Sequence, residues 1–125
     1  MSRRDLTGAV DFSVLDRTTG GDDEVAEEVL GLFVQQAGMW SPMLDARQEG
    51  WKDAVHTILG AAAGIGAGAL ATACAQAEAA EKDVASAKLD DVKDQLDLAL
   101  ADVAAWRHEL MLRSRRASRR CGQSV

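Results

Sequence analysis

The chain has 125 residues, the size of one domain, and 47% of them are hydrophobic, which is enough to fill a single core but leaves no room for a second catalytic domain. The formal charge of −6 is uneven, because residues 1–106 hold 8 Lys and Arg against 19 Asp and Glu, whereas residues 107–125 hold 6 Arg against one Glu. An acidic body argues against general nucleic-acid binding, which depends on neutralising phosphates.

The composition favours helix throughout. Ala, Leu, Asp, Glu and Arg dominate, aromatic residues make up 4% of the chain, and β-branched residues form no run. Two cysteines, Cys74 and Cys121, make neither a disulfide framework nor a metal-binding pair, and the N-terminus does not resemble a secretory signal. We therefore expect an all-α protein of the cytoplasm.

The first half of the chain predicts an arm and two helices. Residues 1–22 are polar and end at two glycines, so we expect an N-terminal arm with at most a short helix. Residues 23–37 carry apolar side chains at helical spacing behind an acidic first turn, which predicts a helix. Ser41 and Pro42 offer an N-cap and an N1 proline for a short second helix that ends at Gly50.

Three more helices are predicted in the second half. The first runs from Trp51 or Lys52 to near Gly66, the second covers about residues 70–83, and the third covers residues 86–112. In the last helix the apolar residues step by three and four, as in the seam of a bundle: Leu89, Val92, Leu96, Ala99, Val103, Trp106 and Leu110. Short connections predict an up-down antiparallel four-helix bundle over residues 23–112, followed by a disordered basic tail, residues 113–125.

Residues 54–77 contain no charged residue and are numerous enough to span a bilayer. Few of them are strongly apolar, and one histidine, two threonines, one glutamine and four glycines oppose insertion. We expect no membrane-spanning helix, and we interpret the GxxxG spacings as close backbone approach within the fold.

His56 is the strongest candidate for a chemically reactive residue. Gly60 lies one turn beyond it on the same face, in a helix interior where glycine costs about 1 kcal/mol relative to alanine. Ala63, Gly64 and Ala67 extend this strip of small residues. The strip would leave the imidazole accessible, and a neutral imidazole has a nucleophilic ring nitrogen. From the residues alone, His56 is either such a nucleophile or an incidental surface histidine.

The segment around His56 resembles the phosphorylation motif of histidine phosphotransfer (HPt) domains, which is roughly H-x-x-K-G-x-x-x-x-[hydrophobic]-G-A. The matching residues are His56, Gly60, Ile65, Gly66 and Ala67. Leu70, Cys74 and Glu78 fall where the family often has Leu, a small residue and Glu. Residues 22–36 are similar to the family's first acidic helix, and residues 49–51 to the turn before its active helix. The resemblance covers roughly residues 8–112.

The resemblance implies that His56 is the phospho-acceptor, which takes a phosphoryl group from an aspartyl phosphate of one receiver domain and returns it to the aspartate of another. The implied partners are receiver domains of a hybrid sensor kinase and of a response regulator. The family has no ATP-dependent kinase activity of its own and needs no cofactor on this chain, since the receiver supplies Mg²⁺. Gly60 and Gly64 would shape the site. We expect a monomer.

One position departs from the motif, because Leu59 stands where the family usually has Lys. Lys52, one turn before His56, is a candidate for supplying positive charge instead, or it is an ordinary solvated residue. Leu59, Ala63 and Ala67 are candidates for contact with the receiver. The substitution at position 59 leaves open a phosphate-silent scaffold that binds receivers without relaying phosphate.

Two further interpretations concern the C-terminal part. The Arg-rich tail makes a helical nucleic-acid-associated protein the runner-up from another class. His108 is interpreted as a surface residue, and no Cys, Asp or His stands at ligand spacing to it or to His56, so no metal site is expected.

Overall fold

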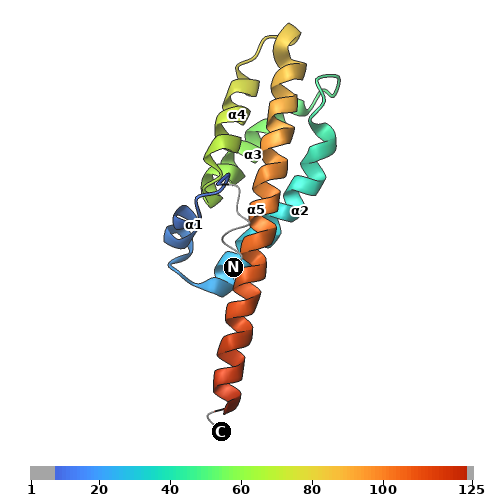
Figure 1. Cartoon of the computed structure of the whole chain (residues 1–125). Helices are drawn as coiled ribbons and strands as arrows, with labels where there is room; N and C mark the ends of the chain where they lie inside the picture. The colour runs from blue at the N-terminus through green and yellow to red at the C-terminus, as the bar shows by residue number, and fades with distance from the viewer. Residues whose placement is uncertain (1–7, 124–125) are drawn as a thin grey trace.

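A computed structural model describes residues 8–123, with side chains described over residues 8–116. All its regular elements are helical (Figure 1). They are, in order, α1 (Phe12–Thr19), α2 (Asp23–Trp40), the short 3-10 helix η2 (Ser41–Met43), α3 (Trp51–Ile65), α4 (Gly68–Glu78) and α5 (Lys82–Gln123). The all-α prediction is confirmed.

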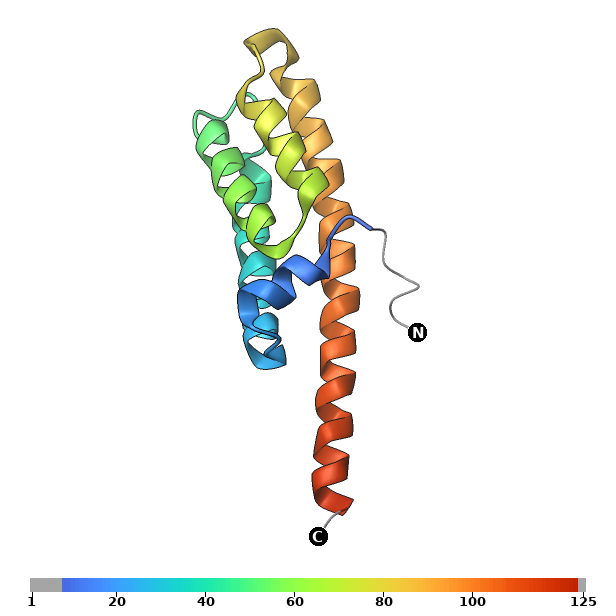
Figure 2. The ribbon, with the colours of Figure 1, turned by 90° about the vertical axis from the view of Figure 1, so that its left-hand side faces the viewer.

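Helices α2, α3, α4 and α5 form an up-down bundle, with α1 lying across it near the start of α2 (Figures 1 and 2). Helix α3 packs on α4 and α2, and α5 packs on the same two helices, so α3 and α5 lie diagonally across the bundle. The predicted seam of α5 is confirmed, because every one of its residues from Leu89 to Leu110 is buried. Each helix therefore has one outward face that the bundle does not cover.

Helix α1 is tied to the bundle through its first residues and the two that precede them. Asp11 caps it by accepting a hydrogen bond from the Ser13 backbone N–H. The Phe12 ring stacks on Trp106 of α5 with centroids 4.7 Å apart, and the Val10 N–H donates to the buried Asp102 carboxylate at 3.2 Å. The predicted arm is thus an ordered short helix over residues 12–19, while its first seven residues lie outside the described part.

The prediction of a second helix from Pro42 to Gly50 is wrong. Only one 3-10 turn forms, over Ser41–Met43, and Gly50 is the N-cap of α3 instead of a helix terminator. The chain turns at Leu44 (φ −80°, ψ 58°) and again at Asp45, whose carboxylate accepts from the backbone and side chain of Arg47. A side chain that bonds its own backbone competes with helix formation, which explains the difference.

The boundaries of the last two helices also differ from the prediction. Helix α4 ends at Glu78 and not near residue 83, and α5 begins at Lys82 and not near residue 86. Their connection is therefore only three residues long, which favours antiparallel packing of α4 on α5.

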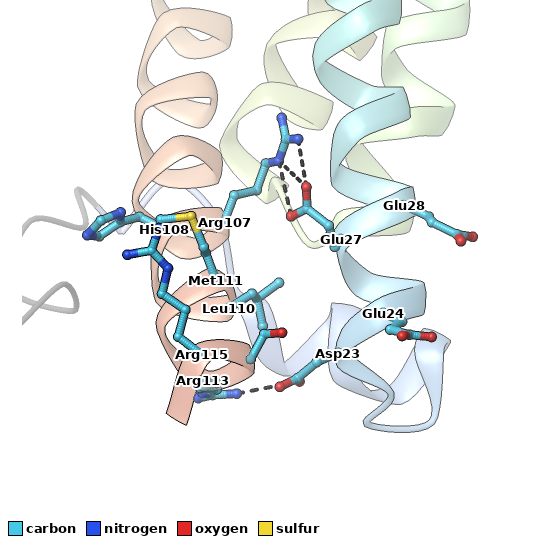
Figure 3. Close-up of a pocket in the computed structure, with 11 residues that line it drawn as sticks. Asp23, Glu24, Glu27, Glu28, Arg107, His108, Leu110, Met111, Arg113 and Arg115 are labelled. Carbon is cyan, nitrogen blue, oxygen red and sulfur yellow. Dashed lines mark hydrogen bonds and ion pairs between the residues drawn. The ribbon is translucent and has the colours of Figure 1, made fainter. Parts of the chain in front are cut away.

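The prediction of disorder from residue 113 is wrong as far as residue 123, because α5 continues that far. The Arg113 guanidinium lies 3.6 Å from Asp23 of α2, and Arg107 makes a 2.7 Å ion pair with Glu27 (Figure 3). Arg113 also lies over the Trp106 ring, 5.0 Å from its centroid. Arg and Ala are strong helix formers, so an established helix continues here without an apolar face. Residues 124–125 lie outside the described part.

In the described part of the chain, no helix has both the length and the apolar character needed to cross a bilayer.

Candidate functional site

His56 lies on the outward face of α3, in its first half. The opposite face of the helix is buried against the core and consists of Ala54, Val55, Ile58, Ala62 and Ile65. These positions recur at helical spacing, so burying them turns His56 toward solvent. Its side chain is 77% exposed. The imidazole is therefore within reach of a partner protein.

Glu78, the last residue of α4, holds one side of the imidazole. Its Oε1 lies 2.7 Å from His56 Nδ1. The contact arises because α3 ends at Ile65, the chain reverses at Gly66 in the left-handed conformation (φ 89°), and α4 returns antiparallel along α3. A carboxylate accepts a hydrogen bond, so this geometry favours the tautomer with the proton on Nδ1 and a lone pair on Nε2. Nε2 is then the nucleophilic atom of the ring.

The strip beside His56 is open. Gly60 and Gly64 are exposed, and a Cβ atom built at either position meets nothing within 4 Å. Ala63 is also exposed. Packing within the described chain therefore does not require glycine at positions 60 and 64, although glycine in a helix interior weakens the helix. The missing side chains leave space for something outside the chain.

The placing of Ala67 in the strip is wrong, because this residue is fully buried. The strip extrapolated α3 beyond its end. The helix stops at Ile65, the chain reverses at Gly66, and Ala67 becomes the N-cap of α4, packed in the core. It cannot contact a receiver in this fold.

Leu59, which replaces the motif lysine, and Lys52, the candidate substitute for its charge, have different surroundings. Leu59 is half-buried and packs against the edge of the core. The Lys52 ammonium lies 5.6 Å from the centroid of the Trp51 ring, and among the described residues it makes no hydrogen bond or ion pair with His56. The structure does not bring Lys52 and His56 into contact.

An apolar edge of α2 borders this face, and the sequence analysis did not identify it. A small groove between α2 and α3 is lined in part by Gln36, Thr57 and Ala61. One turn to either side of Gln36 on α2 stand Leu32 and Met39, which are 56% and 64% exposed. Exposed large apolar side chains are typical of a docking surface, and these two lie on the helix that packs against α3. Their signal in the sequence was an apolar residue outside the core spacing of α2.

A wider groove lies elsewhere, between the first turns of α2 and the lower part of α5, with a volume of about 920 Å³ (Figure 3). Its walls carry Asp23, Glu27, Arg107 and Arg113, which pair across it, and none of its lining residues comes from α3 or α4. Hydrogen bonding to Glu27 raises the pKa of Arg107. This groove is separate from the face that carries His56.

Comparisons with known proteins agree with the geometry. A model of the Hpt domain family matches residues 25–106. The chain is similar to the crystal structure of histidine phosphotransferase ShpA from Caulobacter crescentus, with 50% sequence identity, a TM-score of 0.76, and coverage of 86% of this chain and 98% of that one. A search of curated proteins gave no match. The exposed histidine lies within the matched residues, and the chain therefore belongs to the Hpt domain family and is a histidine phosphotransfer protein of a phosphorelay.

Proposed function

We propose that His56 is the phospho-acceptor of this phosphorelay protein and that it accepts the phosphoryl group on Nε2. The observation that carries the proposal is the exposed imidazole whose Nδ1 is engaged by Glu78 at 2.7 Å, next to a strip without side chains. No other histidine on the described outward faces of α3 and α4 competes for this role.

The transfer needs little from this chain. The Nε2 lone pair attacks the phosphorus of an aspartyl phosphate on a receiver domain, and the receiver's carboxylate leaves as the P–O bond breaks. The Nδ1 proton stays between the ring and Glu78, so the negative charge of Glu78 stabilises the positive charge that develops on the imidazole. In the return step the aspartate of a second receiver attacks the phosphohistidine. The receiver holds the Mg²⁺ that neutralises the transferring group.

The receiver docks, in this proposal, over the face formed by α3 and the neighbouring edge of α2. Gly60, Ala63 and Gly64 let the receiver's backbone approach the imidazole closely, because no side chain stands in the way. Leu32 and Met39 supply apolar area to the rim of the contact. The partners are receiver domains of a sensor kinase and of a response regulator.

The test is incubation with a receiver domain phosphorylated on its aspartate. Label should move to the wild-type chain and be stable to base and labile to acid, as phosphohistidine is, and His56→Ala should abolish the transfer. Glu78→Ala should slow it about tenfold, which corresponds to about 1.4 kcal/mol of barrier, because the ring loses its orienting acceptor. Glu28→Ala removes an exposed carboxylate from α2, in the groove that is separate from the His56 face, and is a matched control that should transfer normally.

The result also separates relay from scaffold. If receivers bind the wild-type chain but no label reaches it from any of them, the relay through His56 is refuted and the phosphate-silent scaffold holds. Transfer of label to the His56→Ala variant would show that another residue is the phospho-acceptor.

A further inference from the structure

An acidic residue, Asp53, stands one turn before His56 on α3. Both residues are exposed. Residues three apart on a helix are neighbours, with Cβ atoms about 5–6 Å from each other. Helical side chains also lean toward the N-terminal end of their helix, so the imidazole leans toward the turn that carries Asp53. A group bound to the ring would therefore lie close to this carboxylate.

No described residue pairs with the Asp53 carboxylate. Thr57 donates a hydrogen bond to the backbone carbonyl of Asp53, and the carboxylate itself makes no hydrogen bond or ion pair within the described part of the chain. Lys52 is the one cation within a turn of His56 along α3, and its ammonium lies 5.6 Å from the centroid of the Trp51 ring. Glu78, which contacts the imidazole, adds a second negative charge. These neighbours of His56 supply two negative charges against one positive charge.

Asp53 also lies in the first turn of α3, where an acidic side chain stabilises the helix through its dipole. The free backbone N–H groups of a first turn attract anions such as a phosphoryl group. The carboxylate of Asp53 offsets that attraction, because it places a negative charge in the same field. Asp53 therefore acts on the helix in every state of the protein, but it acts on the phosphoryl group only when His56 is phosphorylated.

We propose that repulsion by Asp53 raises the free energy of phosphorylated His56, so that the chain passes the phosphoryl group to a receiver instead of storing it. The inference rests on the proposed function. When the Nε2–P bond forms and the receiver's carboxylate leaves, Nδ1 keeps its proton and the phosphoryl group brings about two negative charges to the ring. Asp53 does not touch the reacting atoms, and it acts on the phosphoryl group through its charge alone.

The test is the equilibrium distribution of label between a purified receiver domain and the full chain, at concentrations where little complex forms. This equilibrium constant depends only on the free energies of the phosphorylated and unphosphorylated proteins, so effects on docking or on rate cancel. Asp53→Asn should shift it about two- to fivefold toward phosphohistidine, the effect of one exposed charge. Asp53→Glu keeps the charge and should match the wild type. Asp97→Asn makes the same change on an exposed residue of α5, diagonal to α3, and should leave the constant unchanged.

Salt separates a charge effect from a change of shape. The shift caused by Asp53→Asn should shrink at 1 M salt, where the screening length falls to about 3 Å. An equilibrium constant that Asp53→Asn leaves unchanged overturns the inference, and so does a shift of equal size at low and high salt. If no label reaches the wild-type chain, the assignment of His56 fails instead, so the two failures are distinguishable.

Discussion

In the proposed relay, position 59 lies one helical turn from the phospho-acceptor His56, so a lysine there would bring positive charge near the phosphoryl group. Leu59 is half-buried at the edge of the core, so the aliphatic part of a lysine fits there while its ammonium reaches solvent beside His56. We expect Leu59→Lys to speed transfer about two- to fivefold, the effect of about 0.5–1 kcal/mol from an exposed charge. Single-turnover transfer from a phosphorylated receiver measures this.

Leu59→Gln is the matched control, because it removes the apolar contact without adding charge. If both variants accelerate transfer equally, the effect comes from loss of the leucine, and the missing cation does not limit the rate.

At the scale of single residues, the sequence pointed to His56 and Gly60 through the family pattern, and to the open strip with Gly64 through helical spacing. It did not identify the Glu78 contact as part of the site. That contact depends on where α3 ends and on the register in which α4 returns, neither of which a one-dimensional spacing contains. Ala67 was misplaced for the same reason, since the strip assumed that α3 continues past Gly66.

At the scale of the element, the fold needs one glycine of the α3 segment, Gly66, and does not need another, Gly60. Gly66 has φ 89°, and a Cβ atom there would collide with the backbone carbonyl of Asp11, whose N–H donates to Gly66 O at 2.8 Å. Gly66→Ala should therefore lower the free energy of unfolding by about 2 kcal/mol or more. Gly60→Ala should raise it by about 0.5–1 kcal/mol, since alanine favours a helix and the site has space.

Urea unfolding followed by circular dichroism measures both changes. Gly60→Ala should also slow phosphotransfer, because its methyl group narrows the approach to the imidazole. A Gly60→Ala chain that is less stable than the wild type would contradict the argument that the fold does not need this glycine.

Among the elements, the buried seam of α5 was predictable because its apolar residues keep one spacing from Leu89 to Leu110. The segment after Trp40 was not, because Ser41 and Pro42 are good helix starts whose outcome depends on competition from the Asp45 side chain. The end of α5 was not predictable either, because the Arg-rich segment has no apolar face and its contact with α2, from Arg113 to Asp23, joins residues far apart in sequence.

The reactivity of the Cys74 thiol is a measure of how often the fold opens. It is fully buried, and burial raises the pKa of its thiol from 9.0 to about 12. Since the unfolded thiol loses its proton near pH 9 and the native one does not, this group should lower stability as pH rises from about 9 to 12. In a Cys121→Ser chain, we expect an aromatic disulfide reagent at about pH 8 to label Cys74 only slowly without urea and rapidly in it. Rapid labelling of the folded chain would show local access to the core.

At the scale of the whole molecule, composition and helical spacing were enough to predict an all-helical bundle with one core. Composition and spacing did not reveal which helix faces the bundle leaves uncovered, since that depends on which helices lie diagonally across it. The bundle leaves the His56 face of α3 uncovered, on the side away from α5.

The strip beside His56 also bears on selectivity. Gly60, Ala63 and Gly64 present backbone and methyl groups, which offer a receiver no charge, no hydrogen-bonding side chain and no distinctive shape to read. In the proposed docking mode, such a surface would accept many receivers equally well, so discrimination between cognate and foreign receivers would come from the periphery of the contact, where Leu32 and Met39 lie. In that docking mode, the chemistry of the relay and the choice of its partners would be encoded in separate residues, and either could change without the other.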